Sequence, residues 1–146
     1  MSNKNFFVNF AANCDTTSDI YMKKVIATTD APKAVGPYSQ AILVNGTLYI
    51  SGQIPVNPAD GTVPADIASQ AHQSLKNIGA ILKAAGMGYE NVVKTTVLLA
   101  DIADFKAVNA VYAEYFTADK PARACFQVAA LPMGVGIEIE AIAVED

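Results

Sequence analysis

The Asn45-Gly46 dipeptide is the feature that most restricts how this chain can fold. It separates two β-prone runs, residues 41–44 and 47–51. A type I′ turn needs positive φ at both of its central residues, and Asn-Gly meets that requirement well. The sequence therefore predicts an antiparallel hairpin. Residues 52–64 contain three prolines and two glycines and are predicted to be irregular.

Two amphipathic helices are predicted after the hairpin. The first begins after Pro64 and ends at Gly86, with apolar residues spaced by three or four. Its apolar stripe consists of Ile67, Ala71, Leu75, Ile78 and Leu82. We expect Asp104 to cap the second helix. The apolar side of that helix comprises Phe105, Val108, Tyr112 and Tyr115.

The order of the elements predicts the fold class. Strand patterns also occur in residues 22–30, 92–99, 122–128 and 136–144. The chain thus reads strand, strand, strand, helix, strand, helix, strand, strand. We expect a single α+β domain over residues 22–146, with one six-stranded sheet and two helices packed on one face.

Composition narrows the function classes. Only 16% of the residues are charged, against about 25% in an average soluble domain, which predicts an oligomer that buries further surface. Ten Lys and Arg against 14 Asp and Glu give a net charge of −4, so a nucleic-acid partner is not expected. No apolar run approaches the ~20 residues of a membrane-spanning helix.

Residues 1–21 differ in kind from the rest. Their apolar patch, residues 6–12, is short and interrupted by Asn9, unlike a secretory signal. They contain Asp15 and Asp19 but no Arg, unlike an organellar transit peptide. We expect a dispensable extension, with Met22 as an alternative start, and a cytoplasmic protein.

Scarce residues exclude several kinds of site. The two cysteines, Cys14 and Cys125, form no CxxC motif, so neither a structural zinc site nor any other metal site is predicted. A catalytic triad would need the one histidine, His72, which lies in the first predicted helix with no nucleophile motif nearby. We interpret His72 as a solvent-side helix residue.

Arg123 is the first candidate for chemistry. Strand alternation places Arg123, Cys125 and Gln127 on one face. A guanidinium there can hold a substrate carboxylate through two hydrogen bonds, or it can form an ion pair with a carboxylate of its own chain. The pattern leaves both open. The Cys125 thiol reads as a small hydrophobic group, whereas its backbone carbonyl can take part in chemistry.

Glu138 and Glu140 are the second candidate. They share one face of the last strand, about 7 Å apart, and such a pair can hold unequal pKa values. That face can instead be solvated, or one of the two glutamates can pair with Arg123. If Glu138 and Arg123 lie on adjacent strands, together they form a site for hydrolysis of a small acid.

Four segments together resemble the reactive-intermediate deaminase family (RidA, the YjgF-type enamine/imine deaminases). They are GPYSQA (36–41), SGQIPVNPADG (51–61), VVKTTVLLADIADFKAVNAVYAEYF (92–116) and PARACFQVAALPMGVGIEIEAIAVE (121–145). The resemblance implies a chorismate-mutase-like fold with a mostly antiparallel sheet. It also implies a homotrimer with a central barrel and three clefts between subunits. The implied activity is hydrolysis of 2-enamine and 2-imine acids, such as 2-aminoacrylate and 2-aminocrotonate, to 2-oxo acids and ammonia, without a cofactor.

The resemblance also assigns roles to residues. It implies that Arg123 holds the substrate carboxylate, and that Glu138 and the Cys125 carbonyl position the attacking water. Four further residues would line the cleft: Tyr38, Ser51, Gly52 and Asn109. Three rival functions remain: a non-catalytic sensor of 2-oxo acids or similar small carboxylates, an endoribonuclease or translation inhibitor, and a chaperone-like protein.

Overall fold

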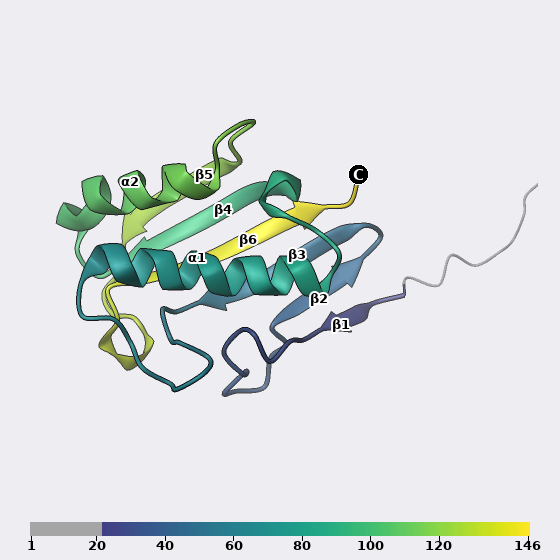
Figure 1. Ribbon diagram of the computed structural model, residues 1–146, viewed down its shortest axis with the longest axis horizontal. Helices are drawn as coiled ribbons and strands as arrows, with labels where there is room; N and C mark the ends of the chain where they lie inside the picture. Colours follow the sequence, from purple (N-terminus) through teal and green to yellow (C-terminus); the bar gives the residue numbers. More distant parts are fainter. Residues whose placement is uncertain (1–21) are drawn as a thin grey trace, which may run out of the picture.

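The computed structural model describes residues 22–146, which form one mixed sheet covered by two helices (Figure 1). The sheet order is β1-β2-β3-β6-β4-β5, and every neighbouring pair is antiparallel except β4 and β5. The strands are β1 (Lys24–Ile26), β2 (Ala41–Val44), β3 (Thr47–Gln53), β4 (Val92–Leu99), β5 (Ala122–Gln127) and β6 (Ile137–Val144). The helices are α1 (Ile67–Ala84) and α2 (Phe105–Tyr115). The predicted α+β class and element order are confirmed.

The predicted hairpin joins β2 to β3. Asn45 and Gly46 have φ values of 49° and 72°, as a type I′ turn requires. The irregular segment begins later than predicted, because β3 continues through Gly52 to Gln53. It does so by way of a bulge between Ile50 and Gln53, where the pairing with β6 shifts.

The core lies between the sheet and the helices, which cover the same face (Figure 1). Leu75, Ile78 and Leu82 of α1 are fully buried, which confirms the predicted stripe. The helix begins where the Asp66 carboxylate accepts a hydrogen bond from the Ser69 N–H at 2.9 Å. It ends as predicted beside Gly86, whose φ is 78°.

The start of α2 differs from the prediction. Asp104 occupies the capping position, but its side chain makes no capping hydrogen bond. Asp101 instead accepts from the Ala103 N–H at 2.9 Å and caps a 3₁₀ turn that precedes α2. Phe105 is 39% exposed rather than buried with Val108 and Tyr112, and its ring lies beside the Arg123 guanidinium.

The second face of the sheet has no helix on it. Residues 138, 140, 142 and 144 of β6 point to this face, since residues 137, 139, 141 and 143 are buried under the helices. Exposed apolar side chains on it include Tyr49, Phe126 and Val144. β5 is the last strand in the sheet order, so one edge of it is unpaired within residues 22–146. No helix in this range is long and apolar enough to cross a membrane.

Candidate functional site

Arg123 lies under α2, on the helix face of the sheet. Its register partner on β4 is Thr95, which is fully buried on that face. The guanidinium donates a 2.7 Å hydrogen bond to Asn109 Oδ1. It also lies 4.7 Å from the ring centroid of Tyr112 and 5.6 Å from that of Phe105. Two aromatic rings and one amide therefore hold Arg123 in place.

The alternative in which Arg123 pairs with a carboxylate of its own chain is wrong for the described part. Within residues 22–146, Arg123 forms no ion pair, and its side-chain partner is the neutral amide of Asn109. A guanidinium has five N–H donors in a planar fork. The remaining donors suit an external carboxylate, which the fork can bind through two parallel hydrogen bonds.

Cys125 follows Arg123 on the same face of β5, as predicted. Burial raises the pKa of its thiol, and the nearby Arg123 charge opposes that shift in part, so the thiol is a poor nucleophile. The Val128 N–H donates to the Leu99 carbonyl of β4 at 2.9 Å. Backbone groups alternate in direction along a strand, so the Cys125 carbonyl points away from β4, toward the unpaired edge. We call Arg123, Asn109 and Cys125 the arginine cluster.

Glu138 lies on the opposite face of the sheet. Its register partner is Leu98, and its carboxylate lies against Gly52 in the β3 bulge. A Cβ atom built on Gly52 would overlap the Glu138 carboxylate, so the close approach requires glycine. Partial burial, and secondarily the charge of Glu140, raise the pKa of Glu138. Glu138 and Glu140 therefore share one face of β6, as predicted.

Ser51 lies next to Gly52 in the same bulge and is bonded to the segment that carries Tyr38. The Ser51 hydroxyl donates to the Ser39 carbonyl at 2.7 Å, and the Ser51 N–H donates to the Gln40 carbonyl at 3.0 Å. These bonds fasten the GPYSQA loop to β3, and Tyr38 lines a hollow together with Gly52. We call Glu138, Gly52, Ser51 and Tyr38 the glutamate cluster.

The hypothesis that Arg123 and Glu138 lie on adjacent strands is wrong. β4 lies between β5 and β6, which places the two strands roughly 9–10 Å apart. The arginine cluster is on the helix face, and Glu138 is on the uncovered face. A single chain therefore brings the predicted residues together as two clusters on opposite faces of the sheet, rather than as one site.

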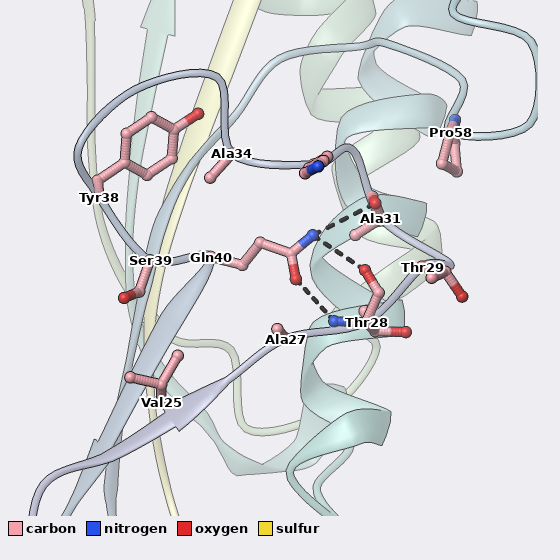
Figure 2. Close-up of a pocket in the computed structure, with 11 residues that line it drawn as sticks. Val25, Ala27, Thr28, Thr29, Ala31, Ala34, Tyr38, Ser39, Gln40 and Pro58 are labelled. Atoms are coloured by element: carbon pink, nitrogen blue, oxygen red, sulfur yellow. Dashed lines mark hydrogen bonds between the residues drawn. The ribbon is translucent and has the colours of Figure 1, made fainter.

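Gln40 is a residue that the sequence analysis missed. It is 5% exposed, and its amide bonds the backbone of Thr28, Ala31 and Pro32. Figure 2 shows Gln40 bonded to Thr28 and Ala31, between β1 and the loop that carries Tyr38. These residues line an open hollow of about 750 Å³. That hollow contains neither Arg123 nor Glu138, so its size does not make it the catalytic site. The sequence signal that could have identified Gln40 is its polar side chain within the GPYSQA segment.

His72 differs from its interpretation as a solvent-side residue. Its Nδ1 lies 2.9 Å from the Tyr115 hydroxyl, and its Nε2 lies 3.9 Å from Glu114. The ring is half-buried between α1 and α2, where it joins the two helices. The described residues contain no cluster of three or more His, Cys, Asp or Glu side chains that could hold a metal ion.

The raised pKa of Glu138 predicts a pH-dependent gain in stability from Glu138→Gln. A carboxyl whose folded pKa is raised above its ordinary value of 4.5 stabilises the fold when protonated. That stability is lost as the pH rises through the folded pKa. We expect the variant to have the higher Tm at pH 8 and the two proteins to converge below pH 4.5, as measured by thermal denaturation. Glu145→Gln is the control for loss of a surface carboxylate, and an equal gain in that variant would contradict the explanation.

The sheet, its two helices and the two clusters define a small α+β domain with a candidate carboxylate-binding arginine at one sheet edge. Residues 28–145 match the sequence profile of the Endoribonuclease L-PSP family. The chain belongs to this family, which is also known as the YjgF/RidA family.

Relatives and solved structures agree on the family. The 2-iminobutanoate/2-iminopropanoate deaminase of Bos taurus is 60% identical over 85% of this chain and 91% of its own. The protein of the same name in Escherichia coli is 55% identical over 84% and 98%. The crystal structure of the YjgF gene product of E. coli has a TM-score of 0.82 at 53% identity, over 84% of this chain and 99% of that one. E. coli TdcF with bound serine has a TM-score of 0.82 at 46% identity, with the same coverage.

Proposed function

We propose that this protein is a 2-iminobutanoate/2-iminopropanoate deaminase, which hydrolyses reactive 2-enamine and 2-imine acids to 2-oxo acids and ammonia. The observation that carries the proposal is Arg123, a positioned guanidinium whose side-chain partner is an amide. The identity of about 60% to deaminases over most of the chain supports it. The serine held by E. coli TdcF is a 2-amino acid similar in size to the proposed substrates. Such an enzyme would remove damaging metabolites.

The opposite placement of the two clusters favours a cleft between subunits. We propose a homotrimer in which Arg123 of one subunit faces Glu138 of the partner subunit. The uncovered sheet face presents Tyr49, Phe126 and Val144 to solvent in one chain, which is costly unless another subunit covers them. Three such faces, closed around an axis, would form a central barrel of the chorismate-mutase-like kind.

The cleft would hold the substrate by its carboxylate. Two N–H groups of Arg123 bind the carboxylate, while the hydrogen bond from Arg123 to Asn109 and the stacking on Tyr112 fix the guanidinium plane. This arrangement orients the imine carbon before any chemistry occurs, and orientation alone removes much of the barrier. Asn109 acts here as a positioning residue.

The chemistry is then addition of water and loss of ammonia. The partner subunit's Glu138 and the Cys125 carbonyl hold a water molecule beside the imine carbon. As the water oxygen bonds to that carbon, one water proton passes through Glu138 to the nitrogen, which gives a carbinolamine with one hydroxyl and one amino group. The hydroxyl proton then passes through Glu138 to the nitrogen as the C–N bond breaks, so that ammonia leaves and the C=O bond of the 2-oxo acid forms. The raised pKa of Glu138 suits it to accept and return this proton, a function worth ~10²–10⁴ in rate. We propose no cofactor for these steps.

Endoribonuclease activity is the competing function, because the word appears in the name of the family and in that of a solved structure from Thermotoga maritima. The net charge of −4 gives little attraction for a phosphate backbone. The imidazole of His72 is bound to Tyr115 between two helices and belongs to neither cluster. A non-catalytic carboxylate sensor would use the same arginine, and only turnover separates it from the enzyme.

The function is tested by trapping imines. An amino-acid oxidase generates 2-imino acids in the presence of semicarbazide, which captures them. We expect the wild-type protein to lower the trapped product while 2-oxo acid and ammonia rise to match. With Arg123→Ala or Glu138→Ala, the amount of trapped product should equal that in the reaction without deaminase. If the wild-type protein also leaves it unchanged for several side chains, the enzyme is excluded and the same cleft should be tested as a sensor.

Gly52→Ala should lower activity without unfolding the protein. The added Cβ displaces the Glu138 carboxylate, which lies at the end of a flexible side chain and can move. The proposed water then loses its base, and kcat should fall about 10²-fold while KM changes little. Steady-state kinetics and circular dichroism measure both effects. Gly61→Ala, where φ is 75° and a Cβ meets nothing within 4 Å, strains a loop without touching Glu138, so it controls for general destabilisation. A loss of kcat in that variant as well would contradict the explanation.

We also propose that residues 22–146 make up the whole catalytic domain and that residues 1–21, which lie outside the described residues, are dispensable for it. The matches to deaminases cover about 85% of the chain, which leaves room for such an extension. A cytoplasmic location stays a prediction.

A further inference from the structure

Thr95 places a hydroxyl group in the hydrophobic core, next to the arginine cluster. It lies in β4, on the helix face of the sheet, and is fully buried. A valine of nearly the same shape would fill this position without removing a polar group from water, which is costly. Packing alone therefore does not explain the threonine, and the partner of its hydroxyl is the feature that matters.

The partner of Thr95 is the phenol of Tyr112. The two oxygens, Thr95 Oγ1 and Tyr112 Oη, lie 2.7 Å apart, and either hydroxyl can donate. Tyr112 is only 7% exposed, so both side chains are buried. Burial raises the pKa of Tyr112, so its hydroxyl keeps its proton near neutral pH and the ring carries no charge. The contact is therefore a hydrogen bond between two neutral groups that are withdrawn from water.

Tyr112 is in turn a ring on which Arg123 stacks. The Arg123 Cζ atom lies 4.7 Å from the centroid of the Tyr112 ring, within the range of a cation–π contact. The other ring beside Arg123 is that of Phe105. It lies farther away, at 5.6 Å, is 39% exposed and has no polar atom that could anchor it. Of the two rings, Tyr112 is thus the one whose orientation the fold fixes by a hydrogen bond.

Sheet register and helix spacing bring these groups together. Thr95 and Arg123 are register partners on the parallel strands β4 and β5, so their side chains stand next to each other. Asn109 and Tyr112 are three residues apart on α2 and share one face of that helix. Asn109 accepts the hydrogen bond from Arg123 Nη1 at 2.7 Å. Two side chains of α2 therefore hold the guanidinium, and Thr95 anchors one of them to β4.

We propose that Thr95 is a positioning residue for carboxylate binding, which acts through Tyr112 on the orientation of Arg123. This inference rests on the proposed function, because it takes the substrate carboxylate as the ligand of Arg123. Two parallel hydrogen bonds to a carboxylate require one orientation of the guanidinium plane. Without the Thr95 hydroxyl, the Tyr112 ring can tilt and the plane loses one of its supports. Since the carboxylate stays bound from substrate to product, this loss should raise KM and leave kcat nearly unchanged.

Thr95→Val and Tyr112→Phe each remove one hydroxyl and keep the shape of the side chain. We expect either variant to raise KM about three- to tenfold in the imine-trapping assay, with kcat within about twofold of the wild-type value. The Kd for the product 2-oxobutanoate, measured by isothermal titration calorimetry, should rise by the same factor. Thr95→Ser keeps the hydroxyl and should restore most of the affinity. Tyr115→Phe is the matched control, because it removes a tyrosine hydroxyl of α2 that bonds His72, and it should leave both constants unchanged.

The double variant that combines Thr95→Val with Tyr112→Phe separates positioning from stability. Each single variant leaves one buried hydroxyl without a partner, which should lower the Tm, whereas the double variant leaves neither and should recover most of the wild-type Tm. Its KM should stay as high as that of either single variant, since all three lack the same bond. In an Arg123→Lys background, Thr95→Val should cause no further rise in KM, because no guanidinium plane is left to orient.

The opposing outcomes are distinct. If the KM of the double variant returns to the wild-type value together with its Tm, Thr95 only stabilises the fold and the proposal is overturned. An equal rise in KM in Tyr115→Phe overturns it as well. If the wild-type protein binds 2-oxobutanoate but hydrolyses no imine, the proposed function fails, and the calorimetric comparison still decides the role of Thr95. If the wild-type protein binds no 2-oxobutanoate, Arg123 is not a carboxylate site and both proposals fail.

Discussion

Arg123→Ala should reduce kcat/KM about 10²–10⁴-fold, the largest effect we expect from any single substitution. Each charge-assisted hydrogen bond to a carboxylate contributes about 1.5–3 kcal/mol, and two are lost together. The fold should tolerate the change. Arg123 is half-buried and bonded to one neutral amide, so its removal costs only a hydrogen bond and its stacking on Tyr112. The imine-trapping assay and thermal denaturation measure the two consequences.

Arg123→Lys separates charge from geometry. A lysine keeps the positive charge but has no planar fork to bind a carboxylate through two parallel bonds. It also loses the stacking on Tyr112. We expect activity between that of the wild-type protein and Arg123→Ala, with most of the loss in KM. If Arg123→Ala instead dissociates or unfolds, Arg123 is a structural residue and the assignment fails.

The local parts of the fold could be predicted because each depends on nearby residues. Asn45-Gly46 sets its own turn, and the spacing along 67–82 sets the buried side of α1. Glycine in SGQIP indicated a close backbone approach, and Gly52 lies against a carboxylate. The prediction that the Asp104 side chain caps α2 was wrong for a local reason. Asp101 lies three residues earlier and caps a 3₁₀ turn in front of the helix, an alternative with nearly the same sequence signal.

The arrangement of the site could not be predicted, because it depends on sheet order. Alternation correctly placed Arg123 with Cys125, and Glu138 with Glu140, each pair on one face of its strand. Nothing in the alternation says that β4 separates β5 from β6, or that the two faces are opposite. Long-range pairing fixes both facts. Gln40 was missed for a related reason, since the backbone groups that it bonds lie 8 to 12 residues away along the chain.

Mixed trimers should recover activity that neither parent variant has. If each cleft takes Arg123 from one subunit and Glu138 from the next, an Arg123→Ala chain and a Glu138→Ala chain can complement each other. Around a cyclic trimer that contains both kinds of chain, one cleft of the three receives both intact side chains. Two affinity tags on the two chains allow isolation of mixed trimers alone. We expect about one-third of the wild-type kcat, with KM near the wild-type value.

The matched control is a mixed trimer of two chains that are both altered in the arginine cluster. One chain carries Arg123→Ala and the other carries Asn109→Ala, and both substitutions affect the same side of the cleft because Asn109 is the amide that holds Arg123. No intact arginine cluster exists in such a trimer, so its activity should not exceed that of Asn109→Ala alone. An Arg123→Ala and Glu138→Ala mixture that stays inactive would mean that both residues must come from one chain. That outcome would contradict the proposed cleft between subunits. Within one chain, β4 separates the strand of Arg123 from the strand of Glu138, and the two side chains lie on opposite faces of the sheet. Complementation therefore tests the assembly and the two-cluster site together. The mixture is active only if the chains associate and if each cleft takes Arg123 and Glu138 from different chains.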